Sequence, residues 1–422
     1  MTESAKATTS HPVVLEMRGI TKVFPGVVAL DDVSMTVHAQ TIHAICGENG
    51  AGKSTLMKVL SGVYPVGSFD GEIVFEGQSA AFHTIRASEE AGISIIHQEL
   101  ALIPELSVTE NIFLGRTIGR HGIIDWVEAK QRATELLARV GLDVDPDTPI
   151  KNLGVGQQQL IEIAKALGKN CRLLILDEPT SALNEDDSAN LLDILRGLKA
   201  KGLTSIMISH KLNEIAAVAD AITVIRDGRV VENIDVTDGK VNEDRIIRGM
   251  VGRDLESRFP EHTPNIGEAF FEVRDWTVEH PFIPGKLVCD HESFFVRRGE
   301  IVGFAGLMGA GRTELARSIF GRTYGTWLGG QILIDGREVE VPTVKSAIEQ
   351  GLAYCPEDRK VQGLNLLDDI KQTVVSAGID RIANHSVIDL DKEGMYAEEY
   401  RVKMRIKAPS IDTGVNTLSG GN

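Results

Sequence analysis

The sequence of 422 residues lacks several features that would place it in other classes of protein. It has no apolar run of about 18 residues, the length that a membrane-spanning helix needs, and residues 1–14 contain no apolar signal core. Its four cysteines form no CxxC pair, which argues against a disulfide framework or a cysteine-based metal site. The net charge is −16 without any basic run, so we expect no nucleic acid as the main partner. These absences favour a soluble protein of the cytosol, which could still contact a membrane-embedded partner locally.

A glycine-rich segment is the most informative feature that is present. It reads Gly47, Glu48, Asn49, Gly50, Ala51, Gly52, Lys53, Ser54 and Thr55. An apolar run, residues 44–46, precedes it, and a helical pattern follows from residue 56. Glycines let backbone N–H groups turn around phosphate oxygens, and the start of a helix adds partial positive charge. This order predicts a phosphate-binding loop in which Lys53 contacts the β- and γ-phosphates and Ser54 holds Mg²⁺.

Two acidic residues, Asp177 and Glu178, follow an apolar run at 173–176. A buried strand that ends in this way places both carboxylates at the carboxyl edge of a sheet, where α/β folds bind ligands. Asp177 would support Mg²⁺, directly or through water, and Glu178 would orient and deprotonate the attacking water. Taken alone, a strand ending in solvated acids is an equally good interpretation, and the phosphate-binding loop upstream favours the catalytic one.

Other signals are weaker when taken singly. His210 ends the apolar run 206–209, and by itself it reads as a hydrogen-bonded core or loop histidine; beside the acids it becomes a candidate contact to the γ-phosphate. Gln98 follows another strand-like run and alone would be an ordinary loop residue. The glycine-rich stretches at 153–159 and 418–422 could each open a helix, as an anion-binding end or as a plain cap.

Strand-like and helical stretches alternate along the chain, which predicts an α/β fold with a mainly parallel, doubly wound core sheet. A helical pattern between about residues 100 and 168 predicts a helical insertion in that core, and Asp227-Gly228 predicts a hairpin. The pattern then recurs at a constant offset of 259 residues, which relates Lys53 to Arg312 and Gly71 to Gly330. A constant offset indicates a duplicated domain. We therefore expect a first domain at 1–252, a linker at 253–268 and a second domain at 269–422.

The order of phosphate-binding loop, Gln, Leu-x-x-Gly-Gln, Leu-Asp-Glu, Ser-Ala-Leu and His resembles the nucleotide-binding cassette of ABC transporters. Residues 181–184 match the D-loop of that family except at Asn184, where Asp is usual. The duplication, Arg312 in the second glycine-rich loop and the segment Pro-Glu-Asp-Arg-Lys at 356–360 resemble the tandem-cassette ATPase subunits of bacterial monosaccharide importers, of the ribose, xylose and galactose type. The resemblance covers nearly all of residues 12–422.

This resemblance implies a duplicated P-loop NTPase fold in which each cassette has a mainly parallel core sheet, an antiparallel β subdomain and a helical subdomain, the second copy being incomplete and degenerate. It implies that ATP hydrolysis drives monosaccharide import at the cytoplasmic face of the bacterial inner membrane. The partners would be membrane-spanning permease subunits, contacted near residues 104–114, and indirectly a periplasmic sugar-binding protein. Two alternatives stay open: a soluble tandem-cassette ATPase outside transport, and a truncated nucleotide-binding protein with little hydrolysis.

The resemblance also assigns site residues, because cassettes of this family pair head to tail around each ATP. The catalytic set at the first site is Lys53, Gln98, Glu178 and His210, and the Mg²⁺ set is Ser54, Gln98 and Asp177. ATP would be held by residues 47–55, by Phe24 stacking on adenine, and by Ser419, Gly420 and Gly421 of the opposite glycine-rich loop. A buried phenylalanine at the end of a strand is the alternative interpretation of Phe24.

The second site departs from the pattern at several positions. The matching residues are Arg312 for Lys53, Ile283 for Phe24, Glu357 for Gln98, and Gly154 in the partnering loop for Ser419. Because arginine and lysine bind phosphate differently, we expect one hydrolytic site and one that turns nucleotide over poorly. The sequence stops at Asn422 inside its second glycine-rich loop, so we expect a fragment or a truncated product whose second core lacks central pieces and which is unstable alone.

Overall fold

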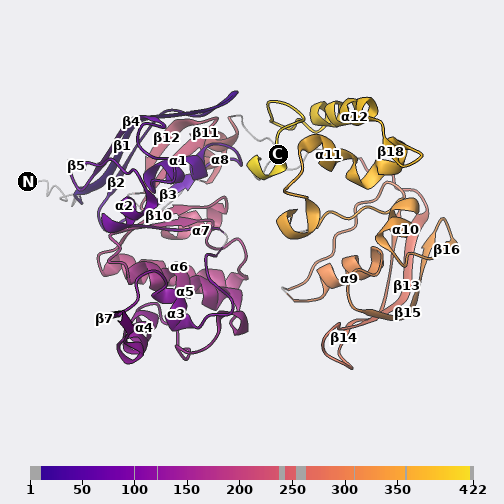
Figure 1. Cartoon of the computed structure of the whole chain (residues 1–422), viewed down its shortest axis with the longest axis horizontal. Coiled ribbons are helices and arrows are strands. Elements are labelled where there is room, and N and C mark those ends of the chain that lie inside the picture. The colour runs from indigo at the N-terminus through magenta and orange to yellow at the C-terminus, as the bar shows by residue number, and fades with distance from the viewer. Residues whose placement is uncertain are drawn as a thin grey trace, which may run out of the picture. The chain divides into compact units, whose positions relative to one another are not determined.

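The computed structural model describes residues 11–98, 100–120, 122–236, 243–252, 263–307, 309–356 and 359–418. These residues belong to two compact units, one built from residues up to 252 and the other from residue 263 onward. Figure 1 labels helices and most of the strands of the two units. Within the described ranges no helix is both long and apolar enough to cross a membrane.

A six-stranded, mostly parallel sheet forms the centre of the first unit, with the strand order β12-β11-β3-β10-β9-β6. Only β12 runs antiparallel to its neighbour. The central strands are buried along their whole length because both faces of the sheet are covered. The strands are β3 (Ile42–Cys46), β6 (Ile93–Ile96), β9 (Leu173–Asp177), β10 (Thr204–Ile208), β11 (Ala221–Arg226) and β12 (Arg229–Asp235).

A four-stranded antiparallel sheet, of order β2-β1-β4-β5, is the second layer of the first unit. Its two long strands alternate buried and exposed residues, as a sheet with one face on a core must. The turn at Asp227-Gly228 joins β11 to β12 with positive φ at both residues, as the sequence predicts. The strands of this sheet are β1 (Val13–Phe24), β2 (Val27–His38), β4 (Asp70–Phe75) and β5 (Gln78–Ser79).

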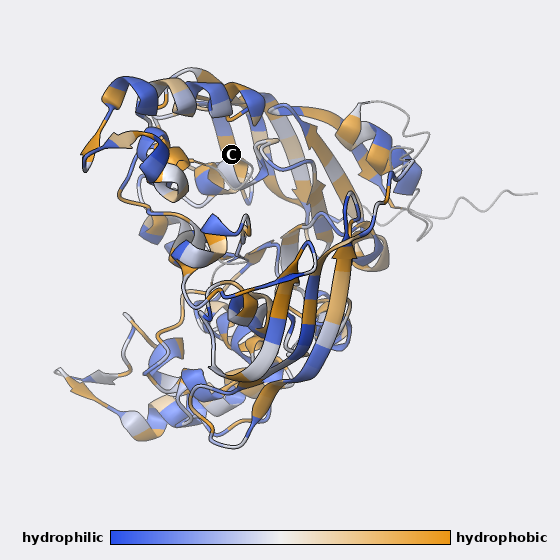
Figure 2. Cartoon of the chain, turned by 90° about the vertical axis from the view of Figure 1, so that its right-hand side faces the viewer, coloured by the Kyte–Doolittle hydropathy of each residue, from blue (hydrophilic) through white to orange (hydrophobic). Residues whose placement is uncertain are grey.

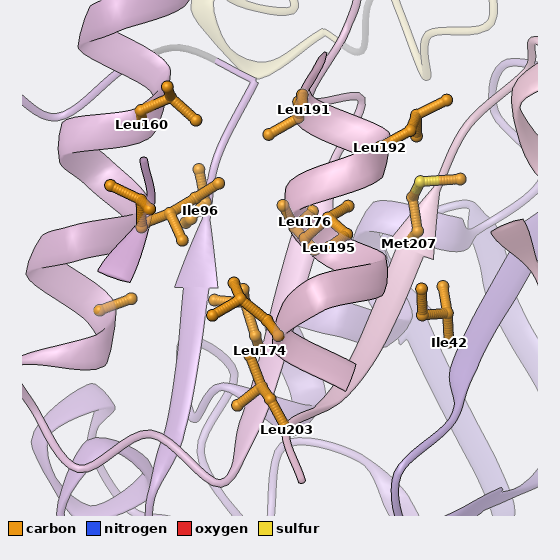
Figure 3. Close-up of a cluster of buried hydrophobic side chains, with 14 of the residues drawn as sticks. Ile42, Ile96, Leu160, Leu174, Leu176, Leu191, Leu192, Leu195, Leu203 and Met207 are labelled. Carbon is orange, nitrogen blue, oxygen red and sulfur yellow. The ribbon is translucent and has the colours of Figure 1, made fainter. Parts of the chain in front are cut away.

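Helices cover the parallel sheet and form the predicted helical insertion. Figure 3 shows α5 and α6 packed over one face of the sheet through leucines such as Leu160 and Leu195, against Leu174 and Met207. The insertion also contains a small hairpin that the sequence analysis missed, made of β7 (Gly119–Arg120) and β8 (Ile123–Ile124). The helices are α1 (Lys53–Leu60), α2 (Ile85–Glu90), α3 (Val108–Ile112), α4 (Trp126–Arg139), α5 (Val155–Leu167), α6 (Glu185–Ala200), α7 (Leu212–Val218) and α8 (Glu243–Val251), with a 3₁₀ turn at Ile150–Asn152.

The second unit repeats the antiparallel sheet of the first, in the order β14-β13-β15-β16. Its strands carry both hydrophobic and hydrophilic residues (Figure 2). Its strands are β13 (Ala269–Glu279), β14 (Leu287–Arg297), β15 (Thr326–Ile334), β16 (Arg337–Val339), β17 (Ala383–Asn384) and β18 (Val387–Ile388). Its helices are α9 (Arg312–Ile319), α10 (Val344–Glu349), α11 (Ile370–Val375) and α12 (Leu390–Lys403), with short turns at Arg359–Gly363, Ser376–Arg381 and Val415–Thr417.

The two units differ where the first has its parallel sheet. The apolar run 301–305 matches β3 by the repeat offset, yet it forms no strand, and Ile301 is 93% exposed. In the first unit β3 lies between β10 and β11, and the described part of the second unit has no strand that matches either of them. A strand needs neighbours for its backbone N–H and C=O groups, so the apolar pattern alone does not produce one here.

One buried histidine makes the stability of the first unit depend on pH. The ring of His43 lies in β3, where its Nε2 is 2.8 Å from the hydroxyl of Thr223, which in turn donates to Asn233. Burial lowers the pKa of His43 from 6.5 to about 4, with His38 adding a smaller effect in the same direction. The folded protein therefore holds the neutral ring, while the unfolded chain takes up a proton as soon as the pH falls below the ordinary value.

We expect the free energy of unfolding to fall as the pH is lowered from about 6.5 to about 4, with His43 contributing about 3 kcal/mol of that loss. The measurement is urea unfolding at a series of pH values, compared with the variant His43→Gln, which keeps a donor but does not titrate. The variant should lose less stability over this window. Equal losses in the two proteins would show that His43 is not the group responsible.

Candidate nucleotide-binding site

The glycine-rich loop of the first unit joins β3 to α1, as the sequence predicts. Gly50 and Gly52 have φ of 85° and 102°, a region that other residues rarely adopt. A side chain on Gly47 would place its Cβ 2.3 Å from the carbonyl oxygen of Ile225. Gly52 and Gly228 both approach the carbonyl oxygen of Ala29 in β2, where added Cβ atoms would lie 2.6 and 2.9 Å away. The glycines are therefore needed for close backbone packing as well as for the turn.

Lys53 is the first residue of α1, and its side chain folds back into this loop. Only 6% of the residue is exposed. Its ammonium group donates to the carbonyl oxygens of Gly47 at 2.8 Å and Glu48 at 2.9 Å. Burial lowers the pKa of Lys53, and the carboxylates of Glu178 and Asp177 oppose that shift. Those carboxylates are close enough to act on the lysine charge, so the loop and the end of β9 form one electrostatic site.

Asp177 is the last residue of β9. Burial raises the pKa of Asp177, an effect that the nearby Ser54 hydroxyl opposes and the neighbouring charge of Glu178 strengthens. A hydroxyl and a carboxylate close together are a donor set suited to Mg²⁺, which takes one or two protein ligands together with substrate phosphates and waters. The side-chain placement thus fits the predicted use of both residues.

Glu178 follows directly and is the point at which three strand ends meet. Its carboxylate accepts a hydrogen bond from Gln98 Nε2 at 3.1 Å and lies 3.1 Å from His210 Nδ1. These partners follow β6 and β10, which are the two neighbours of β9 in the sheet. The side chain is 16% exposed, so it retains access to water. Sequence reasoning selected all three residues, and the structure brings them together.

The third predicted Mg²⁺ ligand is Gln98. Because its amide nitrogen donates to Glu178, its amide oxygen is the end that could face a cation. Within the described ranges no group of three or more His, Cys, Asp or Glu side chains could hold a metal ion. The hydroxyl of Ser54, the carboxylate of Asp177 and the amide oxygen of Gln98 are oxygen ligands of the kind that Mg²⁺ takes together with nucleotide phosphates.

Phe24 lies at the end of β1 and is half-buried. Its ring meets the ring of Tyr64 edge-on, with 5.4 Å between centroids, and the ammonium of Lys22 lies 5.1 Å from its centroid. Lys22 is itself buried and donates to the backbone carbonyl of Ser68. Sequence reasoning missed Lys22 and Tyr64, since neither belongs to a motif. Adenine stacking on Phe24 stays a prediction.

The remaining predicted ligands differ in their placement. Glu48, Asn49, Gly50 and Ser54 are exposed at the loop, Ala51 is buried, and Gly52 and Thr55 are half-buried. Ser419, Gly420 and Gly421 lie outside the described residues, as does Glu357. At the start of α5 the backbone N–H of Gly154 donates to the side chain of Gln157, a helix-capping contact.

The second glycine-rich loop keeps the turn and changes the charged residue. Gly311 precedes α9 with a φ of 87°, which matches Gly52 before α1. Arg312, however, is exposed and makes one long contact, 3.4 Å, to the carbonyl of Leu307. Ile283, the counterpart of Phe24, is 47% exposed. The loop geometry is thus repeated without the buried lysine.

Comparison with known proteins agrees with this geometry. The family model described as "ABC transporter" matches residues 30–181 and again residues 289–422. The chain belongs to the ABC transporter family. Its duplicated match places one cassette sequence in each unit, and the fold is that of the family's P-loop NTPases.

The chain is 58% identical to the L-arabinose transport ATP-binding protein AraG of Geobacillus stearothermophilus, over 97% of the chain and 80% of that protein. It is 50% identical to the xylose import ATP-binding protein XylG of Thermoanaerobacter pseudethanolicus, with the same coverage. Among solved structures, a nucleotide-free ATP-binding cassette from an ABC transporter covers 59% of the chain at 24% identity, with a TM-score of 0.50. That structural likeness supports the fold alone.

Proposed function

We propose that this chain is the ATP-hydrolysing subunit of a bacterial monosaccharide importer. The observation that carries the proposal is the placement of the Glu178 carboxylate, between Gln98 and His210 and close enough to the loop that holds Lys53 to act on its charge. The similarity to proteins named for arabinose transport and xylose import supports a sugar as the cargo. The chain would bind membrane-spanning permease subunits at the cytoplasmic face of the inner membrane and, through them, serve a periplasmic sugar-binding protein.

Nucleotide binding would begin at the glycine-rich loop. Backbone N–H groups at the start of α1 would donate to phosphate oxygens, and the helix dipole favours the same negative charge. Lys53 would exchange its contacts with Gly47 and Glu48 for the β- and γ-phosphates. Mg²⁺ bound by Ser54, Asp177 and Gln98 would neutralise phosphate charge.

Hydrolysis would then depend on Glu178 and His210. Glu178 accepts a proton from a water molecule as that water attacks the γ-phosphorus in line. His210, whose Nδ1 lies 3.1 Å from Glu178 Oε1, would contact the γ-phosphate and so hold that phosphate close to the Glu178 carboxylate. Positioning and charge neutralisation supply most of the rate enhancement in phosphoryl transfer, which is consistent with a site made from four strand and helix ends.

The second site would bind nucleotide without turning it over efficiently. Arg312 takes the place of the buried Lys53, and Ile283 takes the place of Phe24. We propose that the two cassettes occupy residues 1–252 and 269–422, joined by a linker at 253–268, and that Ser419, Gly420 and Gly421 face the first site when the cassettes close. Closure on ATP and release after hydrolysis would give the permease its two states.

The test of this function is sugar uptake by the chain reconstituted in vesicles with its permease and sugar-binding protein. We expect uptake of labelled arabinose, xylose or ribose to require ATP on the side of the vesicle that carries this chain. ATP hydrolysis should rise when the sugar and its binding protein are present. Uptake that proceeds at an equal rate without ATP would contradict the proposal. So would a rate of ATP hydrolysis that is the same with and without the permease.

A further inference from the structure

A cluster of polar side chains joins the segments that carry Glu178 and His210. Its centre is the carboxylate of Glu214 on α7, a residue that is only 5% exposed. The hydroxyl of Thr180 donates to Glu214 Oε2 at 2.5 Å, and the ammonium of Lys211 lies 3.1 Å from Glu214 Oε1. The hydroxyl of Ser209 makes a longer contact to the same carboxylate, at 3.5 Å. We call these four residues the Glu214 cluster.

The members of this cluster come from the two segments that carry the proposed catalytic groups. Thr180 follows Glu178 by two residues, and Ser209 and Lys211 stand on either side of His210. Lys211 links the segments a second time, because its ammonium also donates to the backbone carbonyl of Thr180 at 2.9 Å. The backbone N–H of Lys211 donates to the hydroxyl of Ser209 at 3.0 Å. The cluster therefore fixes the distance between the two segments.

The backbone at Glu178 needs such support. Its φ is 49°, in the left-handed region that costs an L-residue roughly 1–2 kcal/mol. Its N–H donates to the carbonyl of Ile208 at 2.9 Å, so the neighbouring strand holds one side of the residue. The Thr180 hydrogen bond to Glu214 holds the other side. Such conformations persist where the surroundings over-determine them.

Stability alone is a weak reason for this arrangement. The Glu214 carboxylate loses its hydration while the Lys211 side chain stays 33% exposed, and apolar residues of similar volume often stabilise a core equally well. The ion pair and its hydrogen bonds are directional, so they fix the orientation of each group that they link, whereas apolar packing does not. In this chain the linked groups are the two segments that position Glu178 and His210.

We propose that Glu214, acting through Thr180 and Lys211, is a positioning residue for ATP hydrolysis that holds the Glu178 carboxylate and the His210 ring at their working separation. The proposal rests on the function proposed for Glu178 and His210. Since displacement of a catalytic group by about 1 Å can cost about 100-fold in rate, loosening this cluster should act on kcat and leave nucleotide binding intact.

The test compares Glu214→Ala with Glu214→Gln in the full chain within its assembled transporter. We expect Glu214→Ala to lower kcat by roughly 10- to 100-fold while the KM for ATP changes by less than about 3-fold. Glu214→Gln keeps an acceptor for the Thr180 hydroxyl, so it should recover most of the lost rate. A merely structural role would instead lower the melting temperature in both variants without this recovery.

A matched control is available in α5. Glu162 is also a buried carboxylate with a lysine three residues later, Lys165 at 3.7 Å, and it is joined to neither catalytic segment. Glu162→Ala should lower stability and leave kcat unchanged. If Glu162→Ala slows hydrolysis as much as Glu214→Ala does, or if folded Glu214→Ala keeps a kcat within about 2-fold of the unaltered protein, the positioning role is wrong.

Two further variants make every outcome decisive. If Glu214→Ala does not fold, Thr180→Val replaces it, because this change removes the donor at nearly constant volume; a lower kcat at unchanged KM supports the proposal, and an unchanged kcat overturns it. Glu178→Gln is measured in the same assembly. An active Glu178→Gln would overturn the proposed function itself, whereas an inactive Glu178→Gln beside a fully active Glu214→Ala would overturn only the role of Glu214.

Discussion

Replacement of Glu178 by glutamine should leave ATP bound and nearly unhydrolysed. The carboxylate lies between Gln98 and His210, and a carboxamide of the same shape keeps the packing but cannot accept a proton. We expect the hydrolysis rate of the complete transporter to fall by roughly 10²–10⁴, which is the usual contribution of a positioned general base. The dissociation constant for ATP should change little.

The measurement pairs steady-state ATPase rates with equilibrium binding of labelled ATP. In the proposed mechanism hydrolysis reopens the closed cassettes, so the variant should also retain nucleotide on rapid dilution for longer than the unaltered protein does. A variant that hydrolyses ATP at the original rate would remove Glu178 from the mechanism. A variant that fails to bind ATP at all would instead indicate that the carboxylate supports nucleotide binding.

Replacement of Lys53 by methionine should instead weaken the binding of ATP. The ammonium is the charged group inside the loop, and methionine keeps the length of the side chain without the charge. Hydrogen bonds to charged groups contribute about 1.5–3 kcal/mol each, so ATP affinity should fall by roughly 10- to 100-fold or more. Without nucleotide the variant should be at least as stable as the original, because burial already disfavours the charged lysine.

Thermal unfolding with and without Mg-ATP tests both halves of this expectation. The original protein should gain stability at saturating nucleotide, and Lys53→Met should lose most of that gain. Arg312→Met is the matched control, since the exposed arginine of the second loop makes a long contact, 3.4 Å, to the carbonyl of Leu307. An equal loss of nucleotide stabilisation in the two variants would contradict the assignment of the stronger site to the first unit.

The central features of the site were predictable because they are local in sequence. Residues 47–55 combine a strand end, glycines and a helix start within one segment. Asp177 and Glu178 directly follow an apolar run, so the sequence itself places them at the carboxyl end of a strand. Parallel pairing of β6, β9 and β10 then brings Gln98 and His210 to Glu178, as the motif order implies. The fold class follows from the same alternation of strands and helices, and it is confirmed.

Features that depend on tertiary contacts were not predictable in this way. Tyr64 reaches Phe24 from a separate segment, and Glu214, on the helix after β10, contacts Thr180 in the turn after β9. The hairpin of β7 and β8 has strands of two residues each, too short for a periodic pattern. The run 301–305 shows the converse, because its apolar residues resemble a strand while the described part of the second unit offers it no neighbours.

The approach of Gly52 and Gly228 to Ala29 has a mechanical consequence. The N–H of Gly228 donates to the carbonyl of Ala51 at 3.1 Å, and the N–H of Asp31 donates to the carbonyl of Gly228 at 2.8 Å. Loop, turn and β2 are thus interlocked without room for a methyl group. The antiparallel sheet and the phosphate-binding loop should therefore move as one rigid body, and any hinge that opens within the first unit during a transport cycle must be sought elsewhere, on the side of the helical insertion.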